Sequence, residues 1–282
     1  MGTVDYAAPL EGNEHIIERP DGTRLHTTAI GSGAHTVLLA HGYGSASDAW
    51  NLVAPELASA GLRAIAFDQR GHGDSTIGTD GVGTRQMTAD YAAILDHYEV
   101  ENATLVGHSM GGFLSIAFLL GDASAVDRVG SLVLMATFAG DVSRKNPQNR
   151  LQIPLIKWGI LTRLLGFAPI AKAFTKSLSG DGFDPAMVDC FIPTFEKADH
   201  QQLIPILEAM VNESNYGRIG EIKIPTTVIV GSKDKTTPPF HTEDLHAGIA
   251  GSTLMKLPGV GHGLNWEAPD DIVEAIVGLA EA

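Results

Sequence analysis

Short apolar runs that end near Gly or Asp alternate along this chain with segments of helical periodicity. The runs are rich in Val, Ile, Leu and Ala, and they cover Thr36–Ala40, Leu62–Phe67, Ala103–Val106, Ser131–Ala136, Thr226–Val230 and Thr253–Leu257. Continuous apolar runs of this length suit strands that are buried on both faces of a mostly parallel sheet. The pattern therefore predicts such a sheet.

Helical periodicity fills the spaces between several of these runs. The candidate helices are Trp50–Ala60, Gln86–Tyr98, Gly112–Leu120 and Pro269–Leu279. The last begins with Pro269 followed by two aspartates, which favour the positive end of a helix. Strands that alternate with helices predict an α/β fold.

One long segment interrupts this alternation. About eighty residues separate the run that ends at Ala136 from the run that begins at Thr226, which is far longer than an ordinary connection. Prolines divide this segment into helix-like pieces, of which the clearest is Pro185–Val211. We therefore predict an α/β core of residues 1–137 and 220–282 and an inserted helical cap of residues 138–219.

Part of the inserted segment is positively charged, although the chain as a whole is acidic. The 282 residues carry a net charge of −14, which argues against a nucleic-acid partner. Residues 142–180 nevertheless contain seven Lys and Arg and no acidic residue, so the rest of the chain carries −21. Cations mixed with bulky apolar residues indicate a pocket roof or a segment that makes transient contact with a membrane surface. A solvated basic face over an ordinary core is the alternative.

Several other classes of protein receive no support from the sequence. The first thirty residues lack a basic segment followed by an apolar one, so we expect no secretory signal and a cytoplasmic location. The densest apolar stretch is too short to span a bilayer. Cys190 is the single cysteine, and we expect it to be a packed core thiol. No metal or cofactor is predicted.

The chemical signal is the sequence Gly-His-Ser-Met-Gly at residues 107–111. It follows directly from a predicted strand and precedes a predicted apolar helix, which is the setting of a nucleophile elbow. The flanking glycines fit because side chains would clash across so tight a turn. We therefore predict that Ser109 is a nucleophile; a serine that merely caps the helix is the alternative.

A serine nucleophile needs a base, and the base needs an acid that orients it. His262 lies in a Gly-rich turn just after the last strand, whereas His241 and His246 lie in a predicted surface helix, where a solvated role is expected. Asp234 follows the preceding strand and Asp141 follows the strand before that. We predict His262 as the base and Asp234 as the acid, with Asp141 as the alternative acid.

Four blocks of this chain resemble the α/β-hydrolase superfamily. They are His41–Gly44 (HGYG), Asp68–Ser75 (DQRGHGDS), Gly107–Gly112 (GHSMGG) and the two loops that carry Asp234 and His262. The resemblance implies an eight-stranded, mostly parallel sheet flanked by helices, with a cap between strands six and seven. It also implies an oxyanion hole formed by the backbone N–H groups of Tyr43 and Met110.

Other residues of these blocks are interpreted as structural. His41 is expected to hold the oxyanion loop through backbone hydrogen bonds, Asp68, Arg70 and His72 to form a fixed loop, and His108 to pack. Trp158 in the cap and Trp266 after the His262 turn are predicted to line the substrate pocket; for Trp266 a plain core role is the alternative.

Function must come from the site, because this fold hosts many reactions. A serine at the elbow disfavours the dehalogenase and epoxide hydrolase branches of the superfamily, which carry aspartate there. We therefore predict a hydrolase of carboxylic esters, with a lipid-like substrate such as a monoacylglycerol. One alternative is a carbon–carbon bond hydrolase of the meta-cleavage type, although that family usually has Asn at the position of His108 and a longer Gly-rich oxyanion loop. The other is a relative that binds a ligand without turning it over.

Overall fold

The computed structural model describes residues 4–121, 125–146 and 153–281. Its core is a sheet of β1 (Asn13–Glu18), β2 (Arg24–Ile30), β3 (Thr36–Ala40), β4 (Arg63–Phe67), β5 (Ala103–His108), β6 (Val129–Met135), β7 (Thr226–Gly231) and β8 (Thr253–Leu257). The spatial order is β1-β2-β4-β3-β5-β6-β7-β8. Strand β2 runs antiparallel to both neighbours, and the other adjacent strands are parallel.

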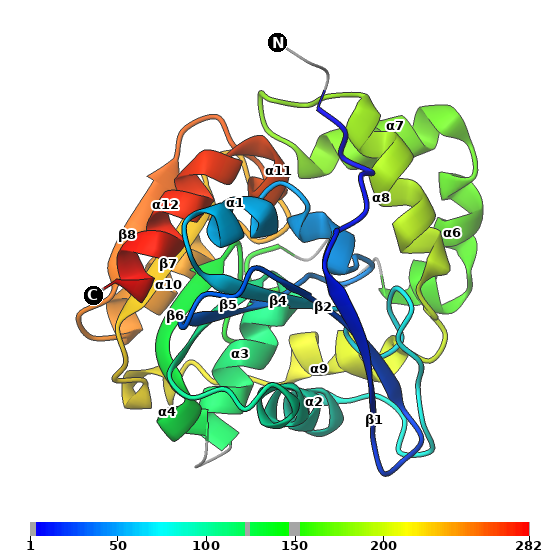
Figure 1. The fold of residues 1–282 in the computed structure, drawn as a ribbon. Coiled ribbons are helices and arrows are strands. Elements are labelled where there is room, and N and C mark those ends of the chain that lie inside the picture. The colour runs from blue at the N-terminus through cyan, green and yellow to red at the C-terminus, as the bar shows by residue number, and fades with distance from the viewer. Residues whose placement is uncertain (1–3, 122–124, 147–152, 282) are drawn as a thin grey trace.

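Helices cover both faces of this sheet. They are α1 (Ala54–Ser59), α2 (Thr84–His97), α3 (Met110–Gly121), α4 (Ala125–Arg128), α10 (Phe240–Gly248), α11 (Leu264–Glu267) and α12 (Pro269–Ala280), with the 3-10 turns η1 (Ser47–Trp50) and η2 (Ile219–Glu221). Figure 1 shows α1 and α12 on one face and α2 and α3 on the other. Strand residues alternate between two clusters: Val37 packs with the α1 side and Leu38 with the α3 side, as the two-residue period of a strand requires.

A helical insert lies between β6 and β7. It contains α6 (Ile160–Leu165), α7 (Ala168–Leu178), α8 (Ala186–Lys197) and α9 (Ile204–Asn212), and α6, α7 and α8 stand together at one end of the molecule (Figure 1). Leu165, Ile192 and Phe195 form a small apolar cluster of their own, whereas Leu207 of α9 belongs to the main core. The cap is therefore anchored to the core through α9.

The six predicted strands correspond to β3 through β8, with ends displaced by no more than two residues. The apolar runs did not predict β1 or β2. Five of the six residues of β1 are exposed, because it is an edge strand. The predicted helix Pro185–Val211 is divided into α8 and α9. Within the predicted helix Trp50–Ala60 only Ala54–Ser59 is α-helical, and Trp50 is the last residue of η1. Within the described ranges, no helix has the length and apolar character needed to cross a membrane.

Candidate active site

Ser109 stands on a sharp turn between β5 and α3. Its φ of +52° is a conformation that costs energy for a residue with a side chain. The turn requires glycine on both sides: a Cβ at Gly107 would lie 2.5 Å from the Cα of Gly112, and one at Gly111 would lie 2.3 Å from the Ala40 carbonyl oxygen. The geometry is that of a nucleophile elbow, which raises the serine hydroxyl above the strand ends.

His262 is oriented by a carboxylate. Its Nδ1–H donates to Oδ2 of Asp234 at 2.9 Å. The carboxylate is fixed in turn, because Oδ1 accepts the N–H groups of Thr236 and Thr237 at 2.8 and 2.9 Å. The Thr237 hydroxyl also lies 2.8 Å from Oδ2. With Nδ1 protonated and paired, Nε2 is left as the acceptor that a general base needs.

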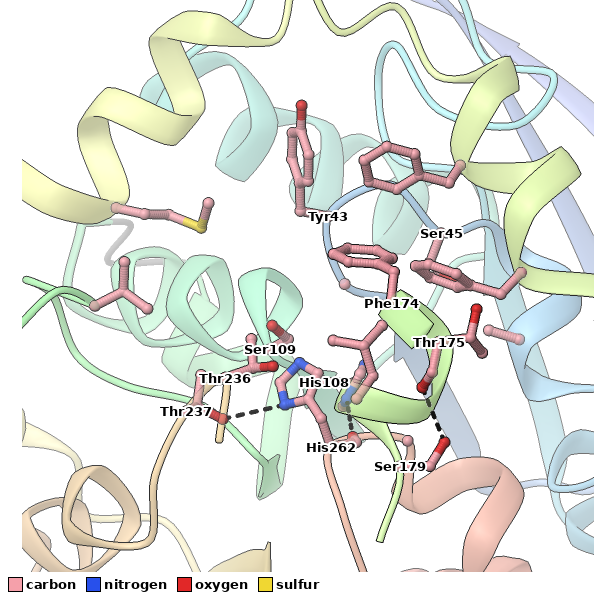
Figure 2. A pocket seen from close by; sticks show the side chains of 18 of the residues that line it. Tyr43, Ser45, His108, Ser109, Phe174, Thr175, Ser179, Thr236, Thr237 and His262 are labelled. Carbon is pink, nitrogen blue, oxygen red and sulfur yellow. Dashed lines mark hydrogen bonds between the residues drawn. The ribbon is translucent and has the colours of Figure 1, made fainter. Parts of the chain in front are cut away.

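Ser109 and His262 meet in one pocket. Both residues line it, and Figure 2 shows the His262 ring pointing toward Ser109. The alternative acid, Asp141, makes a different contact: its carboxylate accepts the Ser143 hydroxyl at 2.7 Å. The structure therefore places Ser109 and His262 in one pocket and pairs His262 with Asp234, whereas Asp141 takes no part in that pair.

Two backbone N–H groups lie beside Ser109. Met110 is the first residue of α3, so its N–H has no acceptor within the helix and lies at the positive end of the helix dipole. Tyr43 follows Gly42, where a Cβ would be 3.2 Å from the Cβ of Ser109. Neither N–H donates to another part of the described chain. Free donors at this place suit an oxyanion hole.

The loop that carries Tyr43 is held from two sides. Nδ1–H of His41 donates to the Gly42 carbonyl at 2.7 Å, and its Nε2 accepts the Gln69 N–H at 2.9 Å, as expected of His41. On the other side, the Tyr43 hydroxyl donates to Nδ1 of His200 at 2.7 Å. Burial lowers the pKa values of both His41 and His200, so both rings remain neutral and keep these contacts.

The loop that carries His262 is fastened to the cap. The backbone N–H of His262 donates to the carbonyl oxygen of Leu178 at 2.6 Å. The carboxylate of Glu267 accepts the N–H groups of Gly180 and Gly261 at 2.7 and 3.1 Å. Burial raises the pKa of Glu267. The end of α7 and the His262 turn are therefore joined through backbone groups.

Neither His200 nor Glu267 was found by the sequence analysis. Both are remote in sequence from the groups that they hold, and neither belongs to a short motif. Thr237 was also missed. Its position three residues after Asp234 is the one signal by which sequence alone could have found it, since such a threonine can hydrogen-bond back to the acid.

The remaining residues of the predicted blocks have structural contacts. The carboxylate of Asp68 accepts hydrogen bonds from the N–H groups of Ser47 and Asp74. The buried guanidinium of Arg70 donates two hydrogen bonds to the carboxylate of Asp90. His108 lines the pocket, and its Nε2–H donates to the His262 carbonyl at 2.9 Å. Burial lowers the pKa of His108 to about 3. His108 therefore supports the His262 turn as a neutral donor.

The pocket above Ser109 is lined mainly by apolar side chains. The cap contributes Ile153, Ile156, Leu161, Phe174, Leu178, Met187, Phe191, Phe195, Leu207, Met210 and Val211. Among the described residues that line it there is no Lys, Arg, Asp or Glu. Polar groups come from Ser45, Thr175, Ser179, Thr236, Thr237 and Asn265, together with the histidines. The pocket suits a neutral and largely apolar ligand.

Two predicted positions need correction. Trp266 lines the pocket, whereas Trp158 does not and is 70% exposed. Ile156 faces the pocket, and a residue two positions further lies about 200° around a helix, on its far side. The prediction for Trp158 is therefore wrong. The solvated role expected of His241 is wrong as well, because its ring is fully buried and contacts the Tyr216 hydroxyl at 2.8 Å.

Cys190 is a buried free thiol, and burial raises its pKa to about 11, which agrees with a packed core role. No group of three or more His, Cys, Asp or Glu within the described ranges is arranged to hold a metal ion.

Residues 37–275 match the alpha/beta hydrolase family. A curated relative is the 2-hydroxy-6-oxononadienedioate/2-hydroxy-6-oxononatrienedioate hydrolase of Paraburkholderia xenovorans (strain LB400), which is 30% identical over 278 residues, 93% of this chain and 92% of that protein. Proteins with the same name from Cupriavidus pinatubonensis and Klebsiella pneumoniae are 29% identical and cover similar shares.

Two solved structures resemble the whole fold. An esterase from Exiguobacterium antarcticum has a TM-score of 0.85 at 24% identity, covering 96% of this chain and all of that chain. A bromoperoxidase from Bacillus anthracis has a TM-score of 0.84 at 23% identity with the same coverage. Identities this low show a shared fold and leave the reaction open.

Proposed function

The chain belongs to the alpha/beta hydrolase family, and on that premise we propose that it is a serine hydrolase that cleaves carboxylic esters with an apolar, lipid-like acyl group, such as a monoacylglycerol. One observation carries the proposal. Ser109 and His262, which is paired with Asp234, lie at the floor of a pocket whose described lining is mainly apolar and contains no Lys, Arg, Asp or Glu.

The reaction follows from the roles of these groups. Nε2 of His262 takes the Ser109 proton while Oγ attacks the carbonyl carbon of the ester. The tetrahedral oxyanion is stabilised by the N–H groups of Tyr43 and Met110, a contribution of about 10² to 10³ in rate for each donor. His262 then protonates the leaving alcohol, and a water molecule activated by the same ring releases the acid from Ser109. Asp234 stabilises the imidazolium ring throughout.

Hydrolysis of a carbon–carbon bond is the second candidate, and the curated relatives support it more directly than they support ester hydrolysis. Both reactions begin with a carbonyl group above Ser109. The substrates in the names of those relatives are dicarboxylates. A carboxylate loses its hydration when it is buried, and without a cation this costs several kcal/mol. No Lys or Arg stands among the described lining residues, which favours the neutral ester.

A substrate panel tests the proposal. The panel contains p-nitrophenyl esters from acetyl to dodecanoyl, a monoacylglycerol, and a ring-cleavage dioate of the type named for the relatives. We expect kcat/KM to rise with acyl length and to be lowest for the dioate. The Ser109→Ala variant is the control for background hydrolysis. A higher kcat/KM for the dioate than for every ester would replace the ester proposal with the second candidate.

A further inference from the structure

The outer surface of the cap exposes large apolar side chains. Within the described chain, most of the exposed large apolar residues lie between residues 155 and 170: Leu155, Trp158, Ile160, Leu164, Phe167 and Ile170. Trp158 is 70% exposed and Phe167 is 63% exposed. A concentration of exposed apolar side chains on one segment marks an interaction surface.

Four exposed cations belong to the same part of the chain as these side chains. Lys157, Arg163, Lys172 and Lys176 are exposed, and none of them forms an ion pair with a described residue. Some lysines outside this segment do pair: Lys197, for example, pairs with Asp74 at 2.6 Å. We call the exposed apolar residues of the preceding paragraph and these four cations the cap face.

The same helices separate the cap face from the pocket. In α6, Leu161 lines the pocket while Ile160 is exposed. In α7, Phe174 lines the pocket, where Figure 2 shows it above the catalytic residues, while Lys172 is exposed. A surface bound to the cap face would therefore lie one helix thickness from the cavity that holds the acyl chain.

We propose that the cap face docks on anionic lipid bilayers. Aromatic and aliphatic side chains insert at the boundary between headgroups and acyl chains, and the cations contact the anionic headgroups. The rest of the protein is acidic, so electrostatic attraction selects this face and repels the others. A second copy of the chain fits less well, because a symmetric contact would bring the four cations against their equivalents. Docking does not depend on which bond the enzyme cleaves.

Binding to vesicles of ether-linked lipids tests docking separately from hydrolysis, because ether lipids have no ester to cleave. We expect the protein to cosediment with phosphatidylserine-containing vesicles, to bind phosphatidylcholine vesicles much less, and to dissociate as salt is raised. Each cation near an anionic surface strengthens binding by roughly fivefold. The triple change Lys157→Glu, Arg163→Glu and Lys172→Glu is therefore expected to weaken binding by about a hundredfold or more.

A matched control changes the same charge elsewhere. The triple variant Arg24→Glu, Arg85→Glu and Lys223→Glu alters exposed cations outside the cap, and we expect it to bind within a few-fold of the wild type. Equal weakening by both triple variants would mean that net charge and not the cap face controls binding, and it would overturn the proposal.

Trp158 provides a direct readout of insertion. Trp50 is buried and Trp266 lies in the pocket, so the emission change on adding vesicles comes from Trp158. We expect a blue shift that the Trp158→Phe variant lacks. The proposal is wrong if the emission of Trp158 does not shift or if the protein binds neutral vesicles equally well. It is also wrong if Trp158→Ala and Phe167→Ala break a dimer while vesicle binding stays unchanged.

Discussion

The floor of the pocket and the cap face differ in how their side chains are held. Asp234 accepts hydrogen bonds at both carboxylate oxygens, and the backbone N–H of His262 donates to the cap. Trp158 and Phe167 on the cap face are largely exposed to solvent, and the cations beside them lack ion-pair partners in the described chain. One region is fixed by many short contacts, and the other is free to meet a surface.

This difference separates two kinds of function. Groups that take part in bond breaking must be placed before the substrate arrives, because orienting them during the reaction costs entropy and solvent reorganisation. Groups that meet a bilayer contact a fluid surface and need no fixed geometry. Changes at the floor should therefore reduce kcat, whereas changes at the cap face should alter where the enzyme acts.

The largest expected effect comes from Ser109→Ala. Removal of the nucleophile is expected to lower kcat for the best ester by about 10⁵ to 10⁶, by analogy with other serine hydrolases. A fluorophosphonate followed by mass spectrometry should give one adduct, on Ser109. An adduct at another residue, or activity in the variant near the wild-type value, would contradict the assignment of the nucleophile.

The second prediction concerns the acid. Asp234→Asn is expected to lower kcat by about 10⁴, because the amide favours the wrong tautomer of His262. Asp141→Asn is the matched control. Its carboxylate contacts Ser143 and not His262, so kcat should stay within a few-fold of the wild type. Steady-state kinetics on one soluble ester measures kcat for both variants. A larger loss of kcat in Asp141→Asn than in Asp234→Asn would assign the role of the acid to Asp141.

The third prediction is a pH dependence of stability that arises from three histidines buried by the fold. Burial lowers the pKa values of His72 and His108 to about 3 and that of His241 to about 4, from an ordinary 6.5. A folded-state pKa below the unfolded value means that the stabilisation is fully present above pH 6.5 and is lost as the pH falls toward the folded value. Each such histidine contributes a slope of up to about 1.4 kcal/mol per pH unit in that window.

Urea unfolding between pH 7 and pH 5 measures this slope. The free energy of unfolding should decrease as the pH falls, and the His108→Asn variant should show a smaller decrease because it has one fewer buried histidine. The cap face contains no histidine and should not contribute. A free energy of unfolding that is constant over this range would show that these rings are not held neutral by the fold.

The smallest expected effect is that of the cap face on a soluble substrate. The triple change of Lys157, Arg163 and Lys172 to Glu should leave kcat/KM for p-nitrophenyl acetate within about twofold, because these exposed charges are screened by salt and none lines the pocket. A loss comparable to that of Asp234→Asn would show that the cap face and the floor are one functional unit.

Much of the fold was predictable because the strands from β3 to β7 are mostly buried, and β8 carries an apolar run although it is an edge strand in which only Leu257 is buried. A strand covered on both faces must be apolar along its length, and such a run is visible in sequence. β1 was not visible, since most of its residues face solvent. Pro169, Pro185 and Pro205 stand at helix starts in the cap, whereas Pro193 lies inside α8. The single predicted helix Pro185–Val211 became α8 and α9 because residues 198–203 turn the chain and allow Leu207 to reach the main core.

The candidate site was likewise predictable only in part. Ser109 was predictable because a local turn requires glycine at fixed spacing. The contacts from His200 to Tyr43 and from Glu267 to Gly180 join residues that are distant along the chain, and no periodicity or motif records such pairs. Trp158 shows the same limit in reverse: the sequence placed an aromatic residue in the cap and did not determine which side of the cap it faces.

The sequence by itself determined the alternation of strands and helices, the elbow at Ser109, the residues available as acid and base, and the basic, apolar composition of the cap. These properties depend on local sterics and on burial, which act over a few residues. Only the tertiary structure decided which acid contacts His262, which cap residues line the pocket, and that Trp158 and Phe167 are exposed to solvent. Those outcomes depend on how distant segments pack, because the same helix can turn either side toward the core until its neighbours fix its rotation.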